Sequence, residues 1–81
     1  MPRGFLNWTS EDVARFLKAR GFILNHTRGS HFYYVGRYGG MFRQVCVPFH
    51  GSKTIKPRTL KGIICQSGIS KEEWLNKGKN D

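Results

Sequence analysis

Near the start of the chain, hydrophobic residues recur at the spacing of one helix face. Val13, Phe16 and Leu17 form this stripe, and basic residues occupy the intervening positions. Thr9-Ser10 precedes the stripe and offers a hydroxyl cap, followed by two acidic residues that suit the positive end of a helix. Gly21 suits a left-handed helix end. The pattern predicts a first helix that begins after Thr9 or Ser10 and ends at Gly21.

The next part of the chain alternates between β-forming runs and glycine-containing turns. Residues 22–27, 31–35 and 41–47 are rich in aromatic and β-branched side chains and predict three strands, the last of which ends at Pro48. Residues 28–30 predict a turn, and three glycines within residues 36–40 predict a loop. Because both connections are short, the three strands are expected to form an antiparallel meander.

Helical periodicity returns after an irregular crossing segment. Pro57 suits the first turn of a helix and Gly68 suits its end, with Leu60, Ile63 and Ile64 as the apolar stripe between them. Residues 70–73 then form a capping box, which predicts a short last helix.

The order of these elements predicts an α+β fold. It is the α-β-β-β-α layout of a double-stranded-RNA-binding-domain-like (dsRBD-like) fold, with a short C-terminal helix added. The two main helices would cover one face of a three-stranded antiparallel sheet and leave the other face open to a partner. At 81 residues the chain is expected to form a single domain over residues 1–81, with its core at about 9–75.

The charge of the chain changes what kind of partner is expected. Lys and Arg number 14 against 5 Asp and Glu, so the net charge is +9. This excess attracts polyanions, with nucleic acid as the first candidate, an anionic membrane surface as the second and a strongly acidic protein as the third. The basic residues are spread along the chain, which indicates a charged face on a folded domain. No apolar run is long enough for a signal peptide or a membrane span, so a cytoplasmic protein without membrane attachment is expected.

The two cysteines do not suggest a metal site. Cys46 and Cys65 lie far apart in sequence, form no CxxC motif and fall inside predicted elements. They are interpreted as small buried hydrophobic residues in a reducing compartment. No metal site and no cofactor are predicted, since the chain lacks Cys and His at the spacing of zinc ligands.

A histidine directly after the first glycine turn is the candidate for chemistry. His31 begins the second predicted strand, and its unperturbed pKa lies near neutral. A histidine can act as a general base on the 2′-hydroxyl of RNA without a metal. The alternative is a turn histidine that only hydrogen-bonds the backbone. The two-residue period of a strand places His31 and Tyr33 on one face, so Phe32 or Tyr34 should enter the core and His31 should lie on or beside the open face.

Several basic and aromatic residues are candidates for RNA binding. Lys53, Lys56, Arg58 and Lys61 gather around the start of the second helix, where they form either a clamp for phosphates or an ordinary solvated face. Arg28, Ser30 and Arg37 flank the second strand. Tyr33 could stack on a base or be a half-exposed strand aromatic. His50 is a candidate second acid or base, with a surface residue as the alternative.

Four stretches in register resemble the HicA (YcfA-like) toxin family. Arg28-Gly29-Ser30-His31-Phe32-Tyr33-Tyr34 is similar to the family's RxGSHxxY signature, and Val45-Cys46-Val47-Pro48-Phe49-His50 to its VxVPxH stretch. The run from Ile55 to Ile63 resembles "(L/I)KPGTLRxI", and the run from Gln66 to Trp74 resembles "QAGxSxEEF". Many members carry a second histidine directly after the first, and this chain has Phe32 there.

The resemblance implies the toxin of a type II toxin–antitoxin pair, a small ribonuclease (mRNA interferase) that cleaves messenger RNA and stops growth. It also implies a HicB-like antitoxin that neutralises the toxin, and it places the catalytic role on His31. A non-catalytic RNA-binding module of the same fold is the alternative. A third interpretation is an inert remnant kept for protein interaction.

Overall fold

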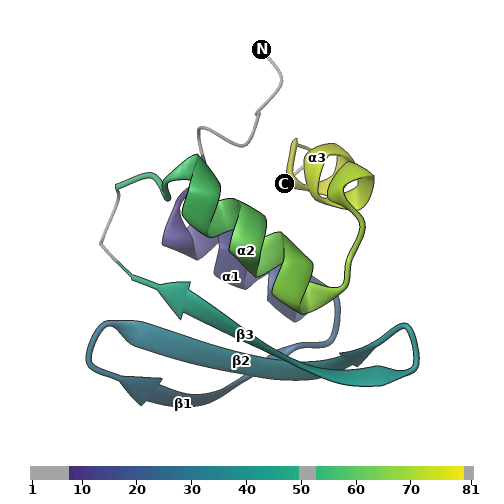
Figure 1. Cartoon of the computed structure of the whole chain (residues 1–81), viewed down its shortest axis with the longest axis horizontal. Helices are drawn as coiled ribbons and strands as arrows, with labels where there is room; N and C mark the ends of the chain where they lie inside the picture. Colours follow the sequence, from purple (N-terminus) through teal and green to yellow (C-terminus); the bar gives the residue numbers. More distant parts are fainter. Residues whose placement is uncertain (1–7, 50–52, 80–81) are drawn as a thin grey trace.

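The computed structural model describes residues 8–49 and 53–79 and confirms the predicted α+β order. The elements are α1 (Ser10–Ala19), β1 (Ile23–Arg28), β2 (His31–Tyr38), β3 (Met41–Pro48), α2 (Pro57–Ser67) and α3 (Lys71–Lys79). The strands form an antiparallel sheet in the order β1-β2-β3. Figure 1 shows α1 and α2 on one side of this sheet, with α3 beyond them.

Helix α1 begins with the cap that its sequence predicts. The Thr9 hydroxyl accepts a hydrogen bond from the Asp12 N–H at 3.2 Å, and the Asp12 carboxylate accepts one from the Thr9 N–H at 3.0 Å. This reciprocal pair satisfies two N–H groups at the N-terminal end of the helix. Gly21 follows the helix with a φ of 90°, which glycine adopts more readily than other residues. Both predicted ends of α1 are therefore confirmed.

The predicted loop at residues 36–40 is wrong in extent. Strand β2 continues through Gly36 to Tyr38, and only Gly39 and Gly40 form the turn, with φ of 66° and 80°. Gly36 has a packing role, because a Cβ built on it would lie 2.8 Å from Cγ of Phe22. Strand β1 also begins one residue later than predicted, so Phe22 precedes the strand and packs into the core.

The second half of the chain follows its predicted pattern. Pro57 lies in the first turn of α2, and Gly68 ends the helix in the left-handed region with a φ of 74°. Leu60 and Ile63 are buried, and Ile64 packs at the edge of the core. The Ser70 hydroxyl accepts from the Glu73 N–H at 3.3 Å at the start of α3.

The core lies between the helices and one face of the sheet. Phe16 and Trp74 stack with ring centroids 4.1 Å apart, which joins α1 to α3. On the sheet side, Tyr34 is only 3% exposed, whereas Phe32 is partly buried against the core. The prediction that one of these two side chains enters the core is confirmed, and the opposite face of β2 carries His31 and Tyr33.

The interpretation of the two cysteines as buried residues is wrong. Cys46 is half-buried and Cys65 is exposed, and both are free thiols. Cys46 alternates with Val45 and Val47, whose side chains are the ones that enter the core. Cys65 lies on α2 away from the face that Leu60 and Ile63 bury. Each cysteine is therefore in a predicted element but on the side of it that does not face the core.

Candidate nucleic-acid interface

His31 is fixed by backbone pairing on both sides, while its side chain is exposed. It follows the turn at Gly29, whose φ is 58°, and pairs with Arg28 of β1 and Pro48 of β3. Pairing continues past the end of the strand, because the Phe49 N–H donates to the Ser30 carbonyl at 2.8 Å. The fold therefore holds the backbone of His31 firmly and leaves its imidazole accessible.

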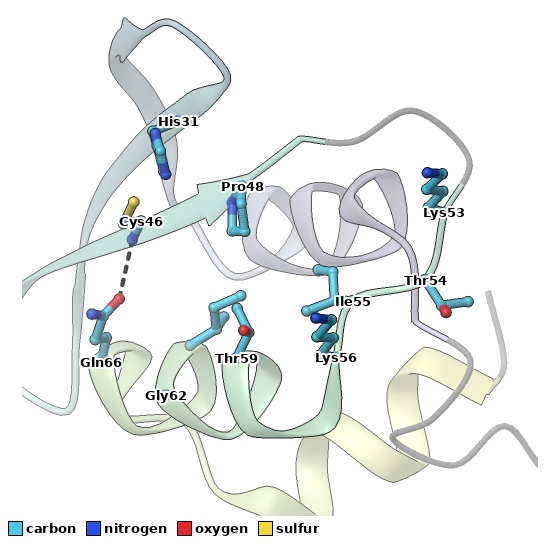
Figure 2. Close-up of a pocket in the computed structure, with 11 residues that line it drawn as sticks. His31, Cys46, Pro48, Lys53, Thr54, Ile55, Lys56, Thr59, Gly62 and Gln66 are labelled. Carbon is cyan, nitrogen blue, oxygen red and sulfur yellow. Dashed lines mark hydrogen bonds between the residues drawn. The ribbon is translucent and has the colours of Figure 1, made fainter.

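His31 lines a groove of about 900 Å³ that has residues of β2 and β3 on one side and α2 on the other. The strand side of the groove consists of His31, Cys46 and Pro48, and the segment before α2 contributes Lys53 to Lys56. Figure 2 shows the His31 ring beside Cys46 and Pro48, with Lys53 at the far end of the groove. The groove thus joins a group that can transfer a proton to groups that can bind a phosphate.

One face of α2 forms the opposite wall. Thr59, Gly62, Ile63 and Gln66 line the groove at the i, i+3, i+4 and i+7 spacing of a single helix face. The side-chain oxygen of Gln66 accepts a hydrogen bond from the Cys46 N–H at 3.1 Å, which fastens α2 to the free edge of β3 (Figure 2). Sequence reasoning missed this wall and the place of Cys46 in the groove. The helical spacing is a signal that could have grouped the four α2 residues.

The four cations expected around the start of α2 divide between two hollows. Lys53 and Lys56 line the groove beside His31. Arg58 and Lys61 line a second hollow of about 390 Å³ together with Pro57 and Lys71. Lys53 and Lys56 precede the helix, whereas Arg58 and Lys61 lie on it and share a face at i, i+3 spacing that differs from the groove face.

The remaining candidates lie at different distances along the sheet. Arg28 and Ser30 are both exposed next to His31, but Arg28 is the last residue of β1, so the predicted turn at residues 28–30 is wrong in extent and only Gly29 and Ser30 form it. Arg37 is exposed six residues further along β2, about 20 Å from His31 at the usual rise per residue. His50 lies outside the described residues.

Tyr33 has a partner of its own on the open face. Its ring stacks on His26 of β1 with centroids 4.5 Å apart and planes 8° from parallel. The Nδ1 atom of His26 lies 2.8 Å from the side-chain nitrogen of Asn25. One face of the Tyr33 ring is therefore covered within the protein.

Metal sites and membrane spans are two further classes of feature that the fold could carry. Among residues 8–49 and 53–79, no three His, Cys, Asp or Glu side chains group in a way that could hold a metal ion. Of the helices in these described ranges, none is long and apolar enough to span a bilayer.

Comparison with known proteins identifies the family. The model of a family described as the HicA toxin of bacterial toxin–antitoxin matches residues 10–69, from the start of α1 to just past α2. No curated protein matches the chain. The matched region includes the turn before His31, all three strands and the α2 wall of the groove. The chain therefore belongs to the HicA toxin family of bacterial toxin–antitoxin pairs.

Proposed function

We propose that this toxin is a metal-independent endoribonuclease that cleaves messenger RNA in the cytoplasm, with His31 as its general base. One observation carries the proposal. His31 opens onto the same groove as Lys53 and Lys56, so a base and two cations face one space that RNA can enter. Membership of the family supports a toxin, and cleavage of messenger RNA is the activity that the resemblance to HicA implies.

The proposed reaction uses the ribose as the nucleophile. His31 accepts the proton of a 2′-hydroxyl, and the 2′-oxygen forms a bond to the adjacent phosphorus. The bond from phosphorus to the 5′-oxygen of the next nucleotide breaks, and that oxygen takes a proton from an acid, for which His50 is the candidate. The products are a 2′,3′-cyclic phosphate and a 5′-hydroxyl.

Cations lower the barrier by balancing charge that develops on the phosphate oxygens. Lys53 and Lys56 line the groove and are assigned this role, while Arg28 at the end of β1 and Ser30 in the following turn contact the RNA backbone. The exposed face of the sheet also bears Tyr33, which stacks a base on its free side.

The proposed partner is a HicB-like antitoxin that covers the groove and the open face of the sheet. Membership of a toxin–antitoxin family implies an antitoxin. A surface with nine excess positive charges favours an acidic partner surface, which would also exclude RNA.

The test compares RNA cleavage by the wild type and His31→Ala in the presence of EDTA. Loss of a general base is expected to slow cleavage by about 10² to 10⁴-fold. RNA binding is measured in parallel and should change little, because the cations that bind the phosphates are unchanged. The product ends, identified by mass, should be a cyclic phosphate and a 5′-hydroxyl.

Two results contradict the proposal in different ways. Binding of RNA without cleavage by the wild type would favour an RNA-binding module of the same fold. Cleavage that EDTA abolishes would show that a metal takes part, and His31 would then need another role.

A further inference from the structure

Helix α2 has a glycine at a position where this residue lowers the stability of the helix. Gly62 lies in the middle of this helix and lines the groove. Glycine destabilises a helix interior relative to alanine, because it loses more backbone freedom on folding.

Neither the backbone nor the packing of the described chain accounts for this glycine. Its φ does not lie in the positive region, unlike that of Gly68 at the end of the same helix. A Cβ built on Gly62 would meet no heavy atom within 4 Å, whereas one built on Gly36 would collide with Phe22. Gly62 is exposed, and the space beside it is open.

Several residues that line the groove near this space are apolar. Ile55 and Ile63 are among them, and because they are only 4% and 2% exposed, they lie at the base of the groove and not on its rim. Pro48 lies on the strand side, and the Thr59 hydroxyl lies one helical turn away on the same wall. Figure 2 shows Thr59 on α2 and Pro48 at the end of β3 on opposite sides of the groove, with Gly62 further along the same helix.

We propose that Gly62 forms a nucleoside subsite, in which the base next to the cleaved phosphate lies against the bare helix backbone. The inference rests on the proposed ribonuclease function and names where the substrate is seated. RNA is favoured as the occupant because the groove has cations on its rim, at Lys53 and Lys56, and apolar residues at its base. These features match the charged backbone and the apolar ring faces of a nucleotide.

The test adds a side chain at Gly62 and the same side chain at a matched position. Gly62→Leu fills the subsite with a residue that favours helix formation. Cys65→Leu places a leucine on an exposed position of the same helix that lines neither hollow. Single-turnover cleavage of a short RNA is measured for both, together with the melting temperature and with binding of the antitoxin.

Gly62→Leu is expected to slow cleavage about 100-fold, the effect of displacing reacting groups by roughly 1 Å, with an unchanged or higher melting temperature. Cys65→Leu should cleave at the wild-type rate. Gly62→Ala adds only one methyl group, so it should raise the melting temperature and slow cleavage less than Gly62→Leu does.

The outcomes separate this inference from the proposed function. Equal cleavage by the wild type and Gly62→Leu would overturn the subsite alone. The same would follow if Gly62→Leu cleaved normally but no longer bound the antitoxin, since the occupant would then be protein. An inactive wild type would overturn the proposed function and the subsite together.

Discussion

At the scale of the residue, Gly36 and Gly62 show how one residue type serves two purposes. Gly36 lies within β2 because the ring and the backbone of Phe22 occupy the place of a side chain, at 2.8 to 3.0 Å from a built Cβ. Gly62 lies beside open space in a helix. In the sequence Gly36 belongs to a glycine-rich stretch and Gly62 stands alone within a helical pattern, and only the folded arrangement shows what surrounds each of them.

The difference predicts opposite effects of the same substitution on stability. Gly36→Ala should lower the free energy of unfolding by about 1–3 kcal/mol, the usual effect of forcing extra volume into a packed site. Gly62→Ala should raise it by roughly 0.5–1 kcal/mol, since alanine favours the helix. Urea unfolding of both variants measures the two changes, and a stable Gly36→Ala would mean that Phe22 can move aside.

Residue-scale prediction from the sequence succeeded where local geometry decides. The position of His31 follows from the turn before it, and the burial of Tyr34 follows from the two-residue period of a strand. The neighbours of His31 could not be predicted in the same way. Cys46 and Gln66 come together across 20 residues, and such an interaction leaves no local trace in the sequence.

At the scale of the element, α2 forms one wall of the groove, and four cations of the chain lie on this helix or just before it. Its start, its end and its core stripe were predicted correctly from the pattern of residues. The four cations near the start of α2 were predicted as one cluster, because they are close in sequence. Lys53 and Lys56 precede the helix and line the groove, whereas Arg58 and Lys61 lie on the helix and share a different face, so the cations divide between two hollows.

The two pairs of cations are therefore expected to contribute differently to the binding of short and long RNA. Replacing Lys53 and Lys56 by alanine should reduce the salt dependence of binding by about 0.7 log units per log salt for each phosphate that the protein no longer neutralises. This should hold for RNA of any length, because the pair lines the groove beside His31. Replacing Arg58 and Lys61 should reduce it only for RNA long enough to pass around α2.

Binding is measured by titration at several salt concentrations, with a short RNA and a long one. An unchanged salt dependence in the Lys53, Lys56 double variant would contradict the assigned path of the RNA backbone. Equal effects of both pairs on the short RNA would place the backbone over the start of α2 instead.

At the scale of the whole molecule, one carboxylate ties three distant segments together. Glu73 of α3 accepts a hydrogen bond from the Tyr38 hydroxyl at 3.1 Å, and its other oxygen lies 2.7 Å from Nε of Arg20. Arg20 follows α1 and Tyr38 ends β2, so these interactions join the two helices to the far end of the sheet. No pattern in the sequence indicates this arrangement, since each residue alone looks like a surface group.

The Tyr38–Glu73 hydrogen bond predicts how stability changes at alkaline pH. This hydrogen bond, together with burial and the charge of the carboxylate, raises the pKa of Tyr38 above its ordinary value of 10. In the unfolded chain the phenol ionises near pH 10, and in the folded protein it ionises at a higher pH. The stabilisation that Tyr38 adds to the free energy of unfolding is therefore fully present below pH 10. It is lost as the pH rises through the folded-state pKa of Tyr38.

The measurement compares the wild type with Tyr38→Phe by urea unfolding from pH 8 to pH 11. The wild type should be the more stable below pH 10, and the difference should shrink as the pH rises further. Tyr34, whose pKa is raised by burial, retains its own alkaline effect in both proteins. A difference that stays constant to pH 11 would show that the interaction with Glu73 does not depend on the phenolic proton.

The central place of β2 in the sheet has a kinetic consequence. Its amides pair with two neighbouring strands, whereas β1 lies at an edge with all six of its residues exposed. Local opening favours segments with little buried surface, so amide hydrogens of β1 should exchange with solvent well before those of β2. The strand that holds His31 would then keep its structure through fluctuations that release the edge, and the histidine would remain in place until the domain unfolds as a whole.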